Sequence, residues 1–390
     1  MSNAPAQPTL NRLLNVLPLL AALFGAVVFL WATHLGGIGT SPDSLSYLTA
    51  GRTLLAGEGL QRFVNLPFTS WPPVLPIALG GVNAFSRALG LDGVEGVRYV
   101  YLLLYMGILF GAVLLLRRYL RSPLLIVLAL LYILLTPNLI SVATFVLSEP
   151  PYIIISLLFL ALLPIALESG KLWQVALLGV LAIIGSMLRY ASFGIVPAGM
   201  VCIVLFMRGR SLRARLLIAL AFGLCTLPYL LWFLYGRSLP TINVTPQADP
   251  VQSLARNFEL TPLLLNEWFV PPMLSGWLSA VLVTAGIVGV LAWALWDYFR
   301  KPQNGHGSDV SLQGTGALPG TLRPESPDVF HSAPQAQRGG MAFTLRTHPA
   351  VPATYVLVYM AMYYAANALI RTTPIDQRHL SVLFIVVVVL

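Results

Sequence analysis

The chain has 390 residues, of which 57% are hydrophobic and only 9% are charged, and its formal net charge at pH 7 is +9. Soluble globular domains carry about 25% charged residues, so this composition excludes an ordinary soluble protein and predicts a chain that lies largely in lipid. The positive charge favours anionic lipid headgroups as partners and not nucleic acid, because no basic stretch with interleaved aromatic residues lies outside the apolar runs.

The first apolar run, 13–33, follows Arg12 and is long enough to span a bilayer. No clear small-residue cleavage site follows it, so we expect an uncleaved signal-anchor, with a cleaved signal peptide as the alternative. Residues 34–95 then form a loop with two helical patterns. The second pattern, 73–90, starts after a Pro-Pro pair and carries polar side chains, so we expect an interfacial or re-entrant helix and not a crossing.

Further apolar runs follow, each near the length of about 20 residues that a spanning helix needs. We therefore expect an all-α polytopic membrane protein with about ten spans. These runs lie at 13–33, 96–116, 123–137, 150–167, 172–188, 191–207, 216–235, 273–296, 351–370 and 379–390. The last run is too short to cross, so we expect either that the sequence is truncated or that the natural chain continues beyond Leu390.

Residues 301–350 interrupt the apolar pattern. The segment is rich in Gly, Pro, Ser and Gln, which predicts a disordered linker. Histidines in or beside it, among them His348, lack the spacing of metal ligands, and we expect them to be solvated.

Basic clusters predict the orientation of the chain. If 73–90 does not cross, all of these clusters fall on the same side as Arg12, and Lys and Arg accumulate in cytoplasmic loops. The clusters lie at 117–121, 171, 208–215 and 300–301. We therefore expect 301–350 in the cytoplasm and the loop 34–95 on the non-cytoplasmic face.

An acid stands at the start of a helical pattern in the first loop, in "SPDSLSYLTAGRTLLAGEGL". Asp43 is either a helix N-cap or first-turn acid held by backbone N–H groups, or a functional acid. Tyr47 lies one turn further on the same face of the helix, and Arg52 lies near its end. Trp71 follows at headgroup depth, either as an interfacial anchor or as a stacking platform.

Two more charged residues stand at the ends of predicted spans, where desolvation is costly unless they are paired or functional. Glu149, in "VLSEPPYI", is either a first-turn acid with Ser148 as its N-cap or a functional acid. Arg189, in "SMLRYASFG" beside Tyr190, either snorkels to mark a turn or binds a phosphate with its planar guanidinium.

The segment "RTTPIDQRH" repeats this combination of charges near the end of the chain. Asp376 is placed to orient Arg378, and Arg371 and His379 add further donors. The sequence holds no HExxH, CxxC or nucleotide-binding glycine motif, so we expect no metal site, and any need for a divalent cation stays open.

Five segments together resemble the GT-C superfamily of polytopic glycosyltransferases, and most closely its members related to protein O-mannosyltransferases and aminoarabinose transferases. These segments are "PDSLSYLTAGRTLLAGEGL", "WPPVLPIALGGVNAFSRALG", "LSEPPY", "MLRYASFGIVPAG" and "DQRHL". Their order covers most of the chain, although each motif is short.

The resemblance implies a sugar donor carried on a polyprenyl phosphate and an inverting transfer to an acceptor hydroxyl of a lipid, protein or polysaccharide. The acid after the first span, here Asp43, would be the catalytic base. Many relatives have two adjacent acids there, whereas this chain has Asp43-Ser44, so Glu149 would supply any second acid. Arginines would stabilise the departing phosphate, with His379 as a further donor. The arginines are Arg189, Arg378 and Arg371.

The same resemblance implies a division of the chain into three regions and a set of residues that line the substrate cavity. Residues 1–300 would form the transmembrane catalytic region, 301–350 the linker, and 351–390 further transmembrane helices. The substrate cavity would be lined by Tyr47, Arg52, Trp71, Tyr190 and Asp376. A transporter or flippase of lipid-linked or amphipathic solutes is the alternative function, and a scaffold that has lost the chemistry is a third.

Overall fold

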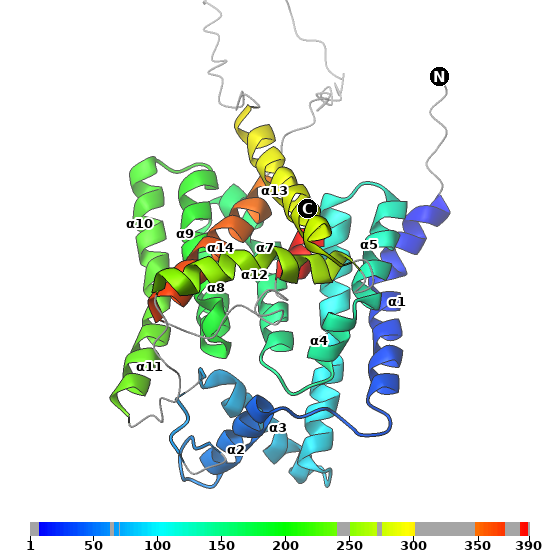
Figure 1. The fold of residues 1–390 in the computed structure, drawn as a ribbon, viewed down its shortest axis with the longest axis vertical. Helices are drawn as coiled ribbons and strands as arrows, with labels where there is room; N and C mark the ends of the chain where they lie inside the picture. The colour runs from blue at the N-terminus through cyan, green and yellow to red at the C-terminus, as the bar shows by residue number, and fades with distance from the viewer. Residues whose placement is uncertain are drawn as a thin grey trace, which may run out of the picture.

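The computed structural model describes residues 8–62, 66–69, 71–239, 250–270, 275–300, 348–370 and 383–388. Within these ranges the chain is helical, and its only β-structure is two isolated bridges (Figure 1). The helices are α1 Pro8–Ala32, α2 Pro42–Leu55, α3 Val74–Ala88, α4 Gly93–Tyr119, α5 Pro123–Leu135, α6 Pro137–Ala143, α7 Glu149–Ser169, α8 Leu172–Leu188, α9 Ile195–Phe206, α10 Leu212–Gly223, α11 Leu227–Ser238, α12 Pro250–Phe269, α13 Trp277–Arg300 and α14 Ala350–Ile370. Two 3-10 helices, η1 Tyr190–Gly194 and η2 Leu224–Thr226, and a short helix at 383–388 complete the described part.

Five of the described helices are long and apolar enough to cross a membrane. They are Leu14–Ala32 of α1, α4, α7, the stretch Leu212–Ser238 that includes α10 and α11, and α13. The pair α5 and α6, bent by 55°, makes a sixth if it is one span. The all-α prediction for a membrane protein is therefore confirmed, whereas the count of about ten spans stays a prediction.

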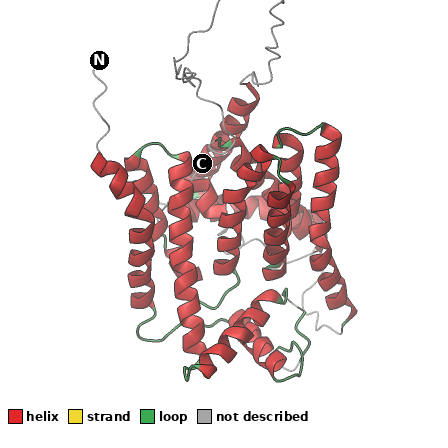
Figure 2. Ribbon diagram, turned by 180° about the vertical axis from the view of Figure 1, so that it is seen from behind, coloured by secondary structure: helices red, strands yellow, loops and turns green. Residues whose placement is uncertain are grey.

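Most helices run side by side along the long axis, and α2 and α3 lie across one end of this bundle (Figures 1 and 2). The basic turns gather at the opposite end, as the charge pattern predicts. There the Arg117 guanidinium donates to the side chain of Asn15 at 2.8 Å, and Arg210 donates to the carbonyl of Gly170 at 3.3 Å. These arginines join α4 to α1 and the α9–α10 turn to the end of α7.

The helices α2 and α3 pack backbone against backbone. A Cβ added to Gly51 would lie 2.8 Å from the backbone nitrogen of Gly80, so only glycine permits this approach. On the other side of α3, the side chains of Asn83 and Ser86 fill the space that a Cβ on α4 would need at Gly93 and Gly96. The helix α3 is not among those suited to cross a membrane, in agreement with the prediction for 73–90.

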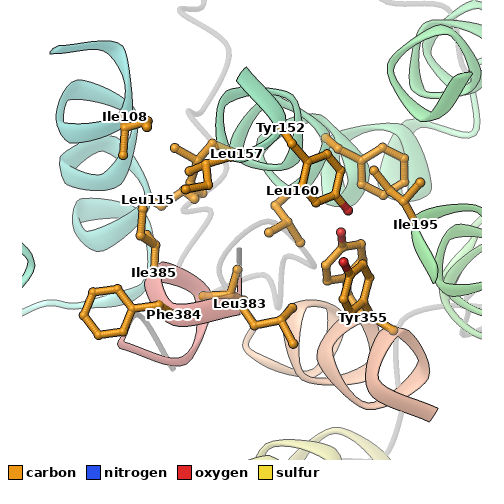
Figure 3. Packing of buried hydrophobic residues seen from close by; sticks show 14 of the residues in the cluster. Ile108, Leu115, Tyr152, Leu157, Leu160, Ile195, Tyr355, Leu383, Phe384 and Ile385 are labelled. Carbon is orange, nitrogen blue, oxygen red and sulfur yellow. The ribbon is translucent and has the colours of Figure 1, made fainter. Parts of the chain in front are cut away.

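Large buried side chains fill the centre of the bundle between α4, α7, α9, α14 and the 383–388 helix. Figure 3 shows Leu157 and Leu160 of α7 in one cluster with Leu115 of α4 and Leu383. In the same view the hydroxyls of Tyr152 and Tyr355 point toward each other, so this core contains polar groups as well as aliphatic ones.

Residues 250–269, between two of the predicted spans, form the amphipathic helix α12, which the sequence did not predict. Its buried face carries Asn257, Thr261 and Trp268, while Glu259 is exposed. The helix crosses the bundle in Figure 1 and packs against α13 and α14. Because both faces of α12 carry polar residues, its sequence contains no long apolar run that would predict a helix.

The helices α13 and α14 meet at a buried histidine. His348 is 6% exposed, with its Nε2 3.3 Å from an Asp297 carboxylate oxygen, and its Nδ1 accepts from the Ala350 N–H at 3.1 Å. The expectation of a solvated histidine is therefore wrong here. Residues 301–347, which hold nearly all of the predicted linker, lie outside the described residues.

Candidate functional site

A parallel β-bridge brings the starts of α2 and α7 together. It pairs Gly39 with Phe145, and the Gly39 N–H donates to the carbonyl of Thr144 at 2.8 Å. Four residues beyond each bridging residue, the chain reaches Asp43 and Glu149, respectively. The two acids singled out in the sequence therefore lie at the beginnings of two helices whose leading segments are hydrogen-bonded to each other.

Ser41, and not Asp43, is the N-cap of α2. The Ser41 hydroxyl accepts from the backbone N–H of Ser44 at 3.2 Å, and the Ser44 hydroxyl accepts from the backbone N–H of Ser41 at 2.9 Å. This reciprocal capping box satisfies the helix start without a carboxylate. Asp43 is a half-buried acid in the first turn.

Glu149 and Arg189 form a buried ion pair. Nη1 of Arg189 lies 2.6 Å from Oε1 of Glu149, and the residues are 9% and 2% exposed, respectively. Arg189 therefore does not snorkel to solvent. Burial alone would lower the pKa of the Arg189 guanidinium, but the charge and hydrogen bond of Glu149 outweigh this effect and raise it.

Ser148 hydrogen-bonds to a member of this pair and does not cap α7 with its side chain. Its side chain makes no capping hydrogen bond, and its hydroxyl donates to Oε2 of Glu149 at 3.3 Å. The residue before it, Leu147, is held to α4 because the Tyr101 hydroxyl donates to its carbonyl at 2.5 Å. The start of α7 is thus anchored from three sides: by the bridge, by α4 and by Arg189.

Tyr47 is a buried residue of α2, one helical turn after Asp43. Burial raises the pKa of Tyr47 well above its ordinary value, and the negative charges of Asp43 and Glu149 raise it further. The charge of Arg189 and a hydrogen bond with Ser148 act in the opposite direction. Three of the charged residues singled out in the sequence are therefore near enough to Tyr47 to act electrostatically on its phenol, which is 2% exposed.

Trp71, predicted as an interfacial anchor or as a stacking platform, packs directly on Tyr47. Their ring centroids are 5.5 Å apart in an edge-on arrangement, and the guanidinium carbon of Arg62 lies 5.4 Å from the centroid of the Trp71 ring. The indole N–H of Trp232 donates to the carbonyl of Trp71 at 3.1 Å, so α11 holds this loop. The two roles given for Trp71 in the sequence analysis stay predictions.

Of the remaining predicted cavity residues, Tyr190 directly follows Arg189, Arg52 lies in α2, and Asp376 lies outside the described residues. The Tyr190 hydroxyl donates to the carbonyl of Thr69 at 2.8 Å, which ties η1 to the Trp71 loop, and Arg52 is exposed in the last turn of α2. The other four predicted residues, Arg371, Asp376, Arg378 and His379, lie outside the described residues, so their roles stay predictions.

Tyr359 of α14 lies beside the segment that follows Arg189, and the sequence did not identify it as a site residue. A Cβ added to Gly194 of η1 would lie 2.9 Å from the Tyr359 ring and 3.1 Å from its Cα, so α14 sits directly on the segment that follows Arg189. Tyr359 is fully buried, and Arg189 acts on it electrostatically. The only local signal is a run of tyrosines in an apolar stretch, "YMAMYYAANA".

The described residues contain no group of three or more His, Cys, Asp or Glu side chains that could hold a metal ion. A cavity of about 260 Å³ lies elsewhere, between α12, α13 and the 383–388 helix, and its lining is apolar. None of the predicted site residues within the described ranges lines this cavity.

Comparison with protein-family models finds no match to this chain, and comparisons with curated proteins and with solved structures find none either.

Proposed function

We propose that this protein is a membrane glycosyltransferase of the GT-C type, with about ten spans in this chain. It would take a sugar from a polyprenyl-phosphate donor and pass it to an acceptor hydroxyl on the non-cytoplasmic face of the cell membrane. The observation that carries the proposal is the bridge between Gly39 and Phe145, which brings the start of α2, with Asp43, beside the start of α7, where Glu149 pairs with Arg189. This arrangement offers an acid and a cation to one reaction.

Asp43 would act as the base. Its carboxylate accepts the proton of the acceptor hydroxyl while that oxygen attacks the anomeric carbon of the sugar. The bond between the anomeric carbon and the phosphate oxygen breaks, and the electron pair leaves with the polyprenyl phosphate. A single displacement of this kind inverts the anomeric centre, and the weakly basic phosphate needs no strong general acid.

Arg189 would stabilise the charge that develops on the departing phosphate. A guanidinium has five N–H donors in a planar fork, so it can bind Glu149 and a phosphate oxygen together. In this proposal Glu149 acts mainly by holding Arg189 in place. Arg371, Arg378 and His379 remain proposed donors from the segment after α14.

The distribution of charge supports the proposed face. The basic turns lie at the end of the bundle opposite α2 and α3, and positive residues mark the cytoplasmic side. A donor with a lipid tail also suits a site at one end of an apolar bundle, where headgroup and hydrocarbon meet.

The test is an assay of the purified protein in liposomes with labelled polyprenyl-phosphate hexose and pentose donors and a membrane extract as the acceptor source. We expect label to leave the donor and unlabelled polyprenyl phosphate to accumulate, in contrast to protein-free liposomes. Movement of intact labelled donor between leaflets without release of sugar would instead identify the transporter. An intact, unmoved donor in every case would point to the scaffold.

A further inference from the structure

The turn between α9 and α10 carries four arginines, in the sequence "RGRSLRAR" over 208–215. It lies at the basic end of the bundle, where α9 and α10 stand side by side (Figure 1). No Asp or Glu occurs between positions 169 and 248, and Glu168, just before this stretch, is half-buried in the last turn of α7. The turn therefore presents a positive surface that favours an anion.

Hydrogen bonds to backbone carbonyls fix the shape of this turn. The Arg215 guanidinium donates to the carbonyls of Arg210 at 3.1 Å and of Val204 at 3.4 Å, and the Arg210 guanidinium donates to the carbonyl of Gly170 at 3.3 Å. These acceptors are neutral, so they leave the positive charges uncompensated. Arg213 is exposed, and its guanidinium makes no hydrogen bond or ion pair with the described residues.

An apolar groove of about 260 Å³ begins at this turn and runs between α9 and α10. Its lining includes Leu205 of α9 and Leu216 and Leu220 of α10, which are 43%, 45% and 63% exposed. Leu216 lies one helical turn after Arg213, and Leu220 lies about 10 Å deeper than Arg213 at a rise of about 1.5 Å per residue. The hydrocarbon of one leaflet is about 15 Å thick, so the groove follows much of its depth.

We propose that the α9–α10 groove binds an anionic phospholipid, with the phosphate against Arg210 and Arg213 and an acyl chain between the two helices. This site is independent of the proposed glycosyl transfer. A guanidinium fork matches two phosphate oxygens, and the groove continues from the arginines as an acyl chain continues from its headgroup. A second copy of the chain fits less well, because a symmetric pair would bring the same positive turns together.

Native mass spectrometry of the delipidated protein in detergent tests the site, because it counts bound lipids and copies of the chain together. The probes are phosphatidylglycerol and phosphatidylcholine with identical acyl chains, and we expect phosphatidylglycerol to bind about tenfold more tightly. Arg213→Gln should weaken phosphatidylglycerol binding about fivefold. Arg121→Gln is the matched control, since Arg121 is exposed in the turn between α4 and α5, and it should change binding by less than about twofold.

Two results of this titration would overturn the proposal. One is equal binding of the two lipids by wild type, and the other is an equal loss for Arg213→Gln and Arg121→Gln. A dimer without bound lipid that dissociates in Arg213→Gln would assign the surface to a second copy of the chain instead.

The groove itself is tested by a pair of alanines on α10. Ala219 lines the groove, whereas Ala221 is exposed outside it. A larger side chain at 219 occupies the space of the acyl chain, so we expect Ala219→Leu to weaken phosphatidylglycerol binding about tenfold and Ala221→Leu by less than about twofold. Unchanged binding by Ala219→Leu would contradict an acyl chain in the groove. Unfolding midpoints without lipid are measured for every variant, and if Ala219→Leu is unstable, the comparison of Arg213→Gln with Arg121→Gln decides the proposal.

Discussion

Replacing Glu149 with glutamine leaves Arg189 buried without a charged partner. The two groups are 2.6 Å apart at their nearest atoms, and the side chains of Arg189 and Glu149 are 10% and 3% exposed. At an effective dielectric constant of about 20, unit charges about 4 Å apart attract by about 4 kcal/mol. Removing one member of a buried pair costs about 3–5 kcal/mol, because the other charge stays desolvated. We therefore expect Glu149→Gln to lower the free energy of unfolding by about 3–5 kcal/mol.

The assay is denaturant unfolding in detergent micelles, followed by tryptophan fluorescence. Glu58→Gln is the control, since Glu58 is an exposed acid in the loop after α2 and should change stability by less than about 0.5 kcal/mol. The variant with both Glu149→Gln and Arg189→Met removes both charges and should be more stable than Glu149→Gln alone. A cost below about 1 kcal/mol for Glu149→Gln would refute the buried pair. A double variant whose loss equals the sum of the losses measured for Glu149→Gln and Arg189→Met singly would refute it as well.

Two substitutions of glycine test the packing around the site. Gly51→Ala places a Cβ 2.8 Å from the backbone of Gly80 and should lower the free energy of unfolding by about 1–3 kcal/mol. Gly81→Ala is the control, because the space at its Cβ is open, and it should cost almost no stability. Equal melting temperatures for the two variants would contradict the close approach of α2 and α3. Gly194→Ala places a methyl group against the fully buried Tyr359, so we expect a similar loss of stability together with a lower rate of sugar release. A variant with the stability and rate of wild type would show that α14 does not pack closely on the segment after Arg189.

The elements near the candidate site follow local rules, which is why the sequence predicted them. Proline, serine and acidic residues at helix starts placed the beginnings of α2 and α7, and the basic turns separated one end of the bundle from the other. The helix α12 was missed because it is amphipathic. Ser41 was passed over as the cap because Asp43 is an equally good capping residue type, and only the geometry of the turn separates the two.

The contacts within the site depend on tertiary structure. Glu149 and Arg189 were each singled out, but their pairing joins positions 40 residues apart and no local pattern encodes it. The same holds for the Gly39–Phe145 bridge, which brings the two acid-bearing segments together. The resemblance placed Tyr47 in the substrate cavity, and only the tertiary structure shows that the residue is 2% exposed.

The proposed chemistry depends most directly on the Asp43 carboxylate. The measurement is the initial rate of sugar release from a labelled polyprenyl-phosphate donor by Asp43→Asn relative to wild type, with Glu58→Gln as the matched control. A general base contributes about 10²- to 10⁴-fold, so we expect a loss of that size for Asp43→Asn and none for the control. A rate for Asp43→Asn within about threefold of wild type would contradict the assignment of the base.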